Sequence, residues 1–409
     1  MKVIFINRFF YPDSSATSQI LSDLAFDLVE NGFDIHVITS RLHYNAGTDE
    51  LPVYEVINGV KVHRIRSTGF GRGRLLGRVF DYLSFYFFMI CKLWELARKG
   101  DIIVAKTDPP LLSIVVSPVA WIKRCRQVNW LQDIFPEVAQ KLRVGGYMMR
   151  WVYYLLRILR NHSLRRADIN IVLGQRMQDY LVSEGIPQDR CYVIPNWADG
   201  RDIFPLDHHN NPLRQEWGLS DKFVIGYSGN FGRAHDFSTI LSSAEKLARM
   251  NEGQDVVFLL IGAGAQLEHV QSVIDKRGLS NIRLQPYQPR QMLAQSLSVP
   301  DIHLVSLNNE LEGFIVPSKF YGIAAAGRMT LFIGAQSGEI PSIIRKHEIG
   351  LTVSEGDAGR LVFEILQYNA DRSKCIDAGL RARSVFDMQF DRAISVRKWE
   401  VLLANLGGG

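Results

Sequence analysis

The chain has 409 residues, of which 47% are hydrophobic and 22% are charged. This supply of apolar side chains is ample for two hydrophobic cores, and its even spread argues against a long disordered tail. The net charge of +5 is a modest excess. No nucleic-acid recognition motif accompanies it, so we do not expect a nucleic-acid-binding protein.

Cysteine usage and the opening residues indicate a cytoplasmic protein. The four cysteines lie far apart without metal-ligand spacing, so we expect free thiols in a reducing compartment. The opening residues MKVIFINRFF enter a strand at once and lack the layout of a secretory signal. No stretch approaches the roughly 20 apolar residues that a membrane-spanning helix needs.

The first half of the chain alternates predicted strands with helical segments. The opening MKVIFIN has the pattern of a buried strand, and residues 18–31 carry apolar side chains at helical spacing. Strands separated by helices of this length predict a parallel sheet covered on both faces. The predicted strands are 1–7, 33–39, 61–65, 101–106 and 127–131.

The second half begins the same pattern again. A strand ends near 191–195, and the Pro-Asn turn after it suggests a hinge at 196–199. We therefore predict an α/β fold with two doubly wound Rossmann-like domains, 1–197 and 198–384, that face a central cleft. The predicted strands are 222–228, 256–261, 282–285 and 301–307, and the predicted helices are 238–250, 266–277, 289–297 and 391–403.

Two segments of the first half combine cations with aromatic residues. Residues 70–99 and 141–166 place Arg and Lys among Trp, Tyr, Phe and Leu at helical spacing. Such segments can lie at a membrane surface, with aromatic rings in the headgroup layer and cations near anionic lipid. Ordinary helices with solvated basic faces are the alternative, but two such segments in one half favour membrane contact.

Residues 306–327, SLNNELEGFIVPSKFYGIAAAG, carry the strongest signal for a binding site. A predicted strand runs into an acidic loop, and a helix with small residues follows. Backbone N–H groups at 313–316 and the helix start near Pro317 can face a phosphate, with Glu312 beside them for a sugar hydroxyl and Ser318 as the helix cap. A strand–loop–helix unit without a ligand fits the same spacing. The candidate phosphate contacts are Gly313, Phe314, Ile315, Val316, Ser318 and Lys319.

Loops after two other strands of the second half add candidates, because ligands of open parallel sheets bind at the carboxyl ends of the strands. Gly229 and Asn230 begin one loop, where a glycine lets the backbone approach a ligand closely. Arg233 offers a fork of donors to a diphosphate, and a plain surface arginine is the alternative. Gly262 and Gly264 follow the next strand but lack a complete dinucleotide fingerprint.

The first domain has two candidate loops of its own. YPDSSATSQ precedes a helix whose N-terminus attracts anions, and the small side chains of Ser14 and Ser15 permit close approach. Asp13 is more typical of a turn-forming aspartate than of a catalytic base or an acceptor contact. Asp133 lies at the end of another strand and could orient an acceptor hydroxyl; a helix cap is the alternative.

These motifs resemble the retaining glycosyltransferases of family 4, which have the GT-B fold. The likeness rests on DIFPE, VIPN, YSGN and EGF…PSKF…AAG and covers nearly the whole chain. The chain departs from the family at Gly322, where a second Glu would hold the ribose hydroxyls. Counted from Gly327, the first acid falls on Phe314, so Glu312 matches only if the loop is two residues longer. The PSKF variant resembles a bacterial subgroup that builds surface polysaccharides such as O-antigen and includes amino-sugar transferases.

The resemblance implies roles for individual candidates. Arg233 matches one member of a basic pair that binds the donor diphosphate. His235 stands near the usual place of the second cation, which Lys319 could supply instead. Family members bind the nucleotide near the turn of Gly262 and Gly264 and the base at the loop of Tyr287. The C-terminal helix, at about 385–405, is implied to pack back on the first domain.

We therefore expect a sugar, with N-acetylated amino sugars and deoxy sugars as options, to move from a nucleotide sugar to a lipid-linked or saccharide acceptor. The resemblance favours UDP over GDP, and we expect no cofactor or metal, because cations and backbone amides can stabilise the leaving diphosphate. The catalytic candidates are Asp133, Glu312 and Arg233. The expected partners are a polyprenyl-diphosphate-linked saccharide and the inner face of the plasma membrane, and no nucleic acid.

Three other functions stay open at this point. A sugar-nucleotide epimerase shares the fold and needs no acceptor. A non-catalytic membrane-associated scaffold would explain the missing second Glu. A Rossmann dehydrogenase would need a complete glycine fingerprint and an acid about 20 residues further on, and the sequence has neither.

Overall fold

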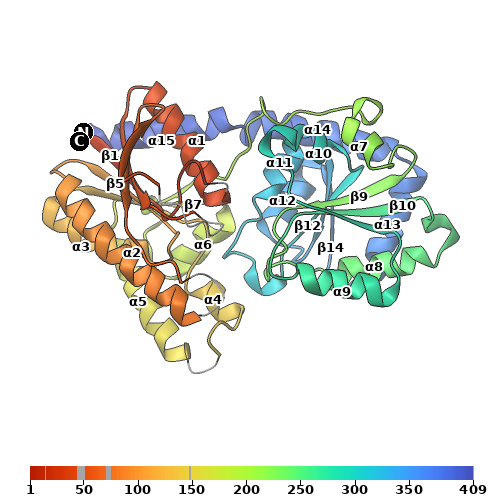
Figure 1. Ribbon diagram of the computed structural model, residues 1–409, viewed down its shortest axis with the longest axis horizontal. Coiled ribbons are helices and arrows are strands. Elements are labelled where there is room, and N and C mark those ends of the chain that lie inside the picture. The colour runs from red at the N-terminus through yellow and green to blue at the C-terminus, as the bar shows by residue number, and fades with distance from the viewer. Residues whose placement is uncertain (14, 44–50, 71–74, 147–148, 409) are drawn as a thin grey trace. The chain divides into compact units, whose positions relative to one another are not determined.

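The computed structural model describes residues 1–13, 15–43, 51–70, 75–146 and 149–408. It contains two compact α/β units (Figure 1). Unit one comprises Met1–Pro195 and Ser395–Gly409, and unit two comprises Asn196–Ile394. Ser14 of the predicted anion-binding turn, and residues 71–74 and 147–148 of the two basic aromatic segments, lie outside the described residues.

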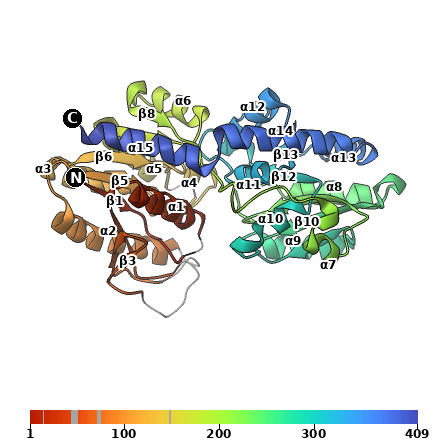
Figure 2. The same cartoon turned by 90° about the horizontal axis from the view of Figure 1, so that it is seen from above.

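Unit one is built on an eight-stranded sheet in the order β3-β4-β2-β1-β5-β6-β7-β8, with β3 and β8 at opposite edges (Figure 2). Its central strands β1 and β5 are mostly apolar and buried, apart from the partly exposed Lys2 and the buried Lys106, as a parallel sheet covered on both faces requires. The strands are β1 (Lys2–Ile6), β2 (Asp34–Ser40), β3 (Tyr54–Ile57), β4 (Val60–Ile65), β5 (Ile102–Lys106), β6 (Arg126–Trp130), β7 (Ile169–Val172) and β8 (Cys191–Val193).

The antiparallel pair β3–β4 is missing from the sequence prediction, which places only one strand in this region. Asn58 and Gly59 join the two strands with φ angles of +46° and +80°, and Ile57 pairs with Val60 across the turn. An Asn-Gly pair between alternating residues is a strong signal for a two-residue hairpin. The signal was present in the sequence and was overlooked.

Helices cover both faces of the unit-one sheet. On one face α2, α3 and α5 lie side by side (Figure 1). On the other face, Trp399 of α15 packs against Phe5 and Trp130, with ring centroids 6.2 and 4.8 Å apart. Most of α15 therefore belongs to unit one, although the chain reaches it from unit two. The helices are α1 (Ala16–Glu30), α2 (Leu75–Leu96), α3 (Leu112–Lys123), α4 (Glu137–Lys141), α5 (Arg150–Arg166), α6 (Gln175–Ser183) and α15 (Arg392–Gly407).

Unit two has a six-stranded, fully parallel sheet in the order β11-β10-β9-β12-β13-β14. The order places β10, β9 and β12 next to one another, so the loops at their carboxyl ends share one edge of the sheet. The strands are β9 (Phe223–Ser228), β10 (Val256–Ile261), β11 (Ile282–Gln285), β12 (Ile302–Ser306), β13 (Met329–Ile333) and β14 (Gly350–Val353).

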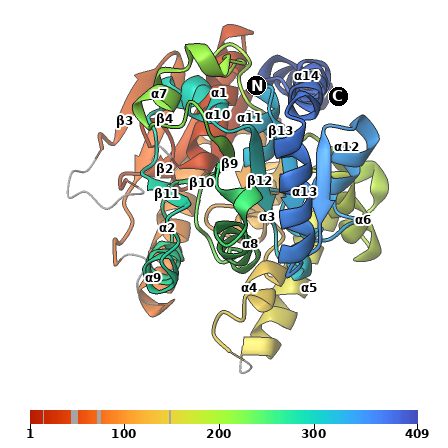
Figure 3. The ribbon, with the colours of Figure 1, turned by 90° about the vertical axis from the view of Figure 1, so that its right-hand side faces the viewer.

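The helices of unit two complete a second doubly wound fold, and α8 packs against α13 (Figure 3). The helix predicted at 289–297 is shorter, because residues 290–292 form a 3₁₀ turn. Within the described residues, no helix has the length and apolarity needed to cross a bilayer. The helices are α7 (Pro212–Glu216), α8 (Ser238–Ala248), α9 (Leu267–Arg277), α10 (Leu293–Ser298), α11 (Lys319–Ala325), α12 (Glu339–His347), α13 (Ala358–Ala370) and α14 (Ser373–Gln389).

Candidate functional site

The loops after β9 and β10 are locked together at the carboxyl edge of the unit-two sheet. Gly229 donates its N–H to the Ile261 carbonyl at 2.9 Å, and Phe231 donates to the Ala263 carbonyl at 2.8 Å. Gly262 and Gly264 have φ angles of +145° and +151°, and a Cβ atom on either would lie within 2.3 Å of the neighbouring loop. Both glycines are therefore required for packing, whatever they do for a ligand.

Lys319, the first residue of α11, lies beneath the Gly229 turn. Its amine nitrogen sits 3.6 Å from the centre of the Tyr227 ring, and a Cβ atom at Gly229 would lie 3.4 Å from it. Among the described residues, this buried nitrogen has no hydrogen-bond partner. Burial lowers the pKa of Lys319 well below its ordinary value. An unpaired buried amine is costly unless a ligand completes its hydrogen bonds.

His235 does not supply the second cation that the family pattern places near it. Its Nδ1 lies 2.6 Å from the Ser306 carbonyl, so Nδ1 donates a hydrogen bond. Burial, with Lys319 as a smaller cause, lowers the pKa of His235 to about 3. The ring is neutral around pH 7, and Lys319 is the basic group that stands against the Gly229 turn.

The other candidates of this edge are exposed to solvent. Arg233 is exposed, and among the described residues its guanidinium forms no ion pair. Asn230 is exposed as well, while its carbonyl accepts a hydrogen bond from the Tyr227 hydroxyl at 2.8 Å. Tyr287 is 53% exposed and donates to the Ala263 carbonyl at 3.4 Å. The structure thus brings Gly229, Lys319, Tyr287 and the paired glycines to one edge.

The predicted row of phosphate-binding amides at 313–316 needs a correction. The N–H groups of Phe314 and Ile315 both donate to the Leu311 carbonyl, at 3.1 and 3.3 Å. These two amides are engaged inside their own turn, which Gly313 permits with a φ angle of +81°. A tight turn satisfies its own donors first, so only part of the row can serve a ligand.

Two further expectations for this segment also change. Ser318 stands at the N-cap position of α11, as predicted, but its side chain makes no capping hydrogen bond. The carboxylate of Glu312 accepts the N–H of Glu339 at 2.8 Å. Glu312 therefore caps α12, and Gly338 leaves room for it, since a Cβ atom there would lie 2.4 Å from Oε2. Its predicted contact with a donor sugar stays a prediction.

Gly322, where the family carries its second acid, faces apolar side chains. A Cβ atom at Gly322 would lie 3.3 Å from Leu297 Cδ1 and 3.9 Å from Ile203 Cδ1. The first side-chain atom of a glutamate here would therefore meet two apolar side chains and no polar group. The departure in sequence therefore agrees with the local structure of α11.

In unit one, Asp133 lies at the loop that follows β6, next to the loop that follows β5. Burial raises the pKa of Asp133 to about 6; a hydrogen bond from the Thr107 side chain opposes the rise, and nearby Asp108 adds to it. The Thr107 hydroxyl also accepts the N–H of Gln132 at 3.2 Å. The alternative role of Asp133 as a helix cap is wrong, because Pro136 holds the N-cap position of α4.

Ser15 occupies the N-cap position of α1, without a capping hydrogen bond from its side chain. Its N–H donates to Asp13 Oδ1 at 2.8 Å, which confirms that Asp13 forms a turn. The Ser15 hydroxyl is buried and unpartnered among the described residues. Its predicted contact with the donor stays a prediction.

Sequence reasoning missed two buried cations near the carboxyl edge of the unit-one sheet. Lys106 donates to the Thr17 carbonyl at 2.7 Å, and its amine lies 4.0 Å from the centre of the Trp130 ring. Arg8 pairs with the buried Asp81 of α2 at 3.4 Å. Lys106 ends β5 and Arg8 lies two residues after the end of β1, so the rule that ranks strand-end loops would have found both.

Comparison with known proteins supports an enzyme class for this arrangement. Residues 16–197 match the family described as Glycosyl transferase 4-like domain. WbjE of Pseudomonas aeruginosa, named as a glycosyltransferase, is 29% identical over 339 residues, which cover 80% of each chain. WcaI of Escherichia coli (strain K12), named for glycosyl transfer in colanic acid biosynthesis, is 25% identical over 251 residues, or 61% of this chain and 60% of that protein.

Solved structures share the fold at low sequence identity. HepE of Anabaena, solved in complex with UDP, has a TM-score of 0.72 at 14% identity and matches 99% of this chain and 100% of its own. WaaG, a glycosyltransferase involved in lipopolysaccharide biosynthesis, has a TM-score of 0.72 at 13% identity, with 100% of both chains covered. These likenesses show the GT-B fold. The matched domain and the two named relatives support glycosyltransferase as the enzyme class.

Proposed function

We propose that this protein is a retaining glycosyltransferase that moves a sugar from a UDP-sugar to a lipid-linked or saccharide acceptor during synthesis of a bacterial surface polysaccharide. The relatives WbjE and WcaI support glycosyl transfer, and the names of WcaI and WaaG support a polysaccharide or lipopolysaccharide setting. An N-acetylated amino sugar or a deoxy sugar is our proposal for the transferred group, and a GDP-sugar is the alternative donor.

The observation that carries this proposal is the unpaired amine of Lys319 beneath the Gly229 turn. The site lies at the carboxyl edge of a doubly wound sheet, where ligands of such sheets bind. A diphosphate there would give the amine the acceptor oxygens that it lacks, and Arg233 would add a fork of donors from the solvent side. The UDP seen in the HepE complex favours this class of ligand.

The reaction needs stabilisation of a leaving diphosphate more than it needs a nucleophilic side chain. As the bond from the sugar C1 to the diphosphate oxygen breaks, negative charge grows on the diphosphate and positive charge grows on the sugar ring. Fixed donors such as the amine of Lys319 and the guanidinium of Arg233 would stabilise that negative charge. We therefore propose transfer without a metal ion; no group of three or more His, Cys, Asp or Glu side chains in the described part of the chain could hold one.

We assign the donor to unit two and the acceptor to unit one. Ionised Asp133 would accept a hydrogen bond from the acceptor hydroxyl and act as the base that draws its proton away. A saccharide on a polyprenyl diphosphate would be met at the inner face of the plasma membrane, where we propose that the protein acts peripherally. The resemblance to family 4 supports retention of the anomeric configuration.

A thermal-shift panel with UDP, GDP, dTDP and ADP tests the donor assignment, because a ligand that binds only the folded state raises the melting temperature. We expect UDP to give the largest rise and the Lys319→Met variant to lose it. Transfer assays with and without EDTA test the metal assignment. A wild-type protein that no nucleotide stabilises would overturn the proposed function.

Two other functions fit the fold less well. An epimerase would convert a nucleotide sugar without any acceptor, and product analysis in the absence of acceptor separates it from a transferase. A non-catalytic scaffold is supported only by the missing acid at Gly322, and the named relatives do not favour it. Detectable transfer or donor hydrolysis would exclude the scaffold.

A further inference from the structure

Helix α5 has its polar face turned inward and its apolar face turned outward. Of its five buried residues, which face the rest of unit one, three are polar and two are not: Arg160, Asn161 and Ser163, with Tyr153 and Leu164. On the opposite side, Trp151 is 77% exposed and Leu155 is 59% exposed. A helix on the surface of a water-soluble domain has the reverse pattern, with apolar residues inside. The exposed apolar side chains of α5 are Trp151, Val152, Tyr154, Leu155, Ile158 and Leu159.

The inward polar face is fully engaged, so α5 cannot simply be rotated to bury its apolar side. The Arg160 guanidinium donates to both oxygens of buried Glu137, at 2.7 and 3.2 Å. Asn161 donates to Glu184 at 2.9 Å, and Ser163 donates to the Ser113 hydroxyl at 2.9 Å. A half-turn of the helix would break these bonds and leave buried charges unpaired, which is strongly unfavourable. The orientation of α5 is therefore built into the fold.

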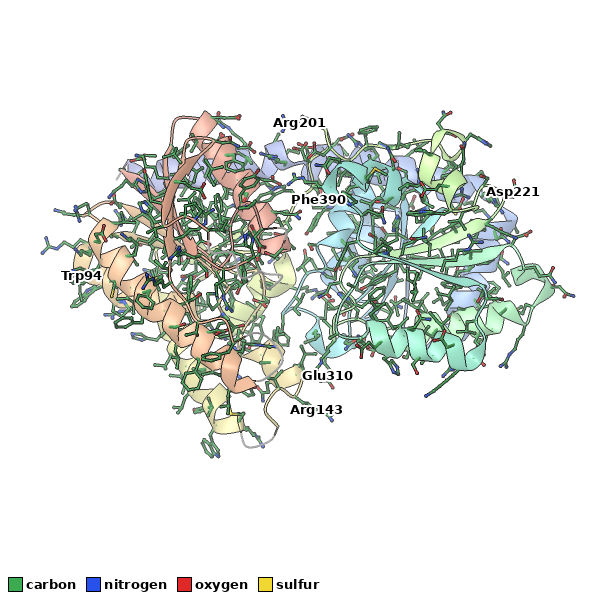
Figure 4. The ribbon with its side chains drawn as sticks, viewed as in Figure 1. Trp94, Arg143, Arg201, Asp221, Glu310 and Phe390 are labelled. Atoms are coloured by element: carbon green, nitrogen blue, oxygen red, sulfur yellow. The ribbon has the colours of Figure 1, made fainter. Side chains whose placement is uncertain are left out.

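The outward apolar side continues across the neighbouring helices. We call the exposed side chains of α2, α3 and α5 the helical face. Trp94 of α2, labelled in Figure 4, lies 4.4 Å from the Lys123 amine of α3, measured from the ring centre. Monomeric soluble proteins rarely expose contiguous apolar patches larger than a few hundred Å². Besides the residues of α5, the face includes Leu76, Val79, Phe80, Leu83, Phe87, Phe88, Ile90, Trp94, Trp121 and Ile122.

Cations outnumber acids on the helical face. The sequences of α3 and α5 contain no acid, and they contribute Lys123 and the exposed Arg150, while Arg157 is paired with Glu184 and Arg160 is buried. On α2, Asp81 is buried in a pair with Arg8, and Glu95 is paired with Lys92. A surface that mixes aromatic rings, aliphatic chains and cations matches the boundary between headgroups and acyl chains of an anionic bilayer.

We propose that the helical face of unit one docks on an anionic phospholipid bilayer, with α5 as the principal anchor. Its apolar side chains enter the headgroup–acyl boundary, while Arg150 and Lys123 contact lipid phosphates. A symmetric dimer through the same face would set the basic surface of one copy against that of another, which electrostatics disfavour. The proposal rests on the proposed function for the presence of a membrane-bound acceptor, but docking itself needs neither donor nor acceptor.

Vesicle flotation of the full chain tests the docking. Vesicles of phosphatidylcholine with phosphatidylglycerol should carry the protein to the top of the gradient, and vesicles of phosphatidylcholine alone should carry much less. The triple variant Trp151→Ser, Leu155→Ser, Ile158→Ser should bind anionic vesicles at least about tenfold more weakly, because these side chains supply the buried apolar area. A wild-type chain that binds neither vesicle, or a triple variant that binds like the wild type, would overturn the proposal.

A matched control is available in unit two. Ile376, Leu380 and Met388 on α14 are 64%, 65% and 62% exposed, so their serine variants remove similar apolar surface outside the helical face. These variants should float like the wild type. Equal losses from both triple variants would point to non-specific adhesion and contradict the docking surface. Should the α5 variant fail to fold, Phe87→Ser with Trp94→Ser on α2 replaces it, with a melting curve to verify the fold.

A charge variant and light scattering distinguish a bilayer from a protein partner. Lys123→Gln with Arg150→Gln should reduce binding to anionic vesicles severalfold and leave the weak binding to neutral vesicles unchanged. If the wild-type chain does not bind vesicles but forms a dimer in light scattering, and the α5 triple variant is monomeric, the helical face would instead bind a second copy of the chain. Vesicle binding without any nucleotide binding would contradict the proposed function alone, and transfer without vesicle binding would contradict the docking alone.

Discussion

Each unit buries a lysine against an aromatic ring at the carboxyl edge of its sheet, and the two lysines differ in what their amines contact. Lys106 of unit one lies over Trp130 and donates to the Thr17 carbonyl at 2.7 Å. Lys319 of unit two lies over Tyr227, and its buried nitrogen has no acceptor among the described residues. Burial lowers the pKa of both amines.

The difference separates a structural cation from a ligand-binding one. The fold itself supplies the acceptor for Lys106, so this residue ties β5 to the first turn of α1. For Lys319, the part of the chain that the structure describes supplies no hydrogen-bond acceptor to offset the cost of burying the amine. A buried amine that contacts an aromatic ring but has no hydrogen-bond acceptor among the described residues fits a site whose remaining partner is a ligand, and a diphosphate has the required oxygens.

The largest effect should come from Lys319→Met. Methionine fills similar volume and removes the unpaired amine, so we expect transfer to fall about 100-fold to 1,000-fold, as for the loss of a preorganised donor. The melting temperature should stay or rise, because a buried unsatisfied group is lost. Initial rates and a melting curve on the same preparation measure both. A variant that is both active and unfolded more easily would make Lys319 structural.

Lys106→Met should show the opposite behaviour. It leaves the Thr17 carbonyl without its donor, and we expect the free energy of unfolding to fall by about 1–3 kcal/mol. Transfer per folded molecule should change far less than in Lys319→Met. Chemical denaturation measures the free energy of unfolding, and initial rates corrected for the folded fraction measure transfer. Loss of donor affinity in the Lys106 variant would contradict the assignment of Lys106 as structural and Lys319 as ligand-binding.

Arg233→Ala should have a smaller effect than Lys319→Met, because its guanidinium is exposed and solvent screens its attraction to a phosphate. We expect donor affinity to fall roughly tenfold, and Arg233→Lys should restore part of it. Titration of both variants with UDP provides the measurement. Unchanged affinity in Arg233→Ala would make the residue an ordinary surface arginine.

The pH dependence of Asp133 gives the mildest expected effect. Burial raises the pKa of its carboxyl from 3.8 to about 6, so the ionised acceptor form is lost as pH falls through about 6, and transfer should fall severalfold with it. Asp133→Asn should flatten this limb of the profile. A variant that keeps the wild-type profile would remove Asp133 from the reaction.

The raised pKa of Asp133 also determines the direction in which this residue makes folding stability depend on pH. The native state holds the Asp133 proton more tightly than the unfolded state does, so its contribution to stability is present below pH 3.8 and is lost as pH rises through about 6. Relative to the wild type, Asp133→Asn should therefore be more stable at pH 7 than at pH 3.8. Denaturation curves at the two pH values measure this difference, and an equal effect at both would contradict the assigned pKa.

The sequence predicted most of the strands, because buried parallel strands are continuous apolar runs, but β7 was not among the predicted strands. β1, β5 and β10 lie within one residue of their expected bounds. The hairpin at Asn58-Gly59 was predictable and was missed. The amides of Phe314 and Ile315, and the unused cap at Ser318, were not predictable, since spacing alone does not say which acceptor a donor will find.

Burial was the hardest property to predict. Lys106 and Lys319 look alike in sequence, and only the structure shows that one amine donates to Thr17 while the other has no acceptor within the described ranges. Helix α5 likewise shows its basic and aromatic residues in sequence, but the inward turn of Arg160 depends on Glu137, which lies on α4. The amphipathic pattern predicted a special helix without predicting which face is outside.

Calorimetric titration of the wild type and Lys319→Met with UDP and with uridine tests the assignment of the diphosphate site most directly. We predict that the wild type binds UDP at least about 100-fold more tightly than uridine, and that Lys319→Met loses most of this preference while its affinity for uridine is unchanged. An unchanged ratio of the two affinities in the variant would show that Lys319 does not bind the diphosphate and would contradict the account.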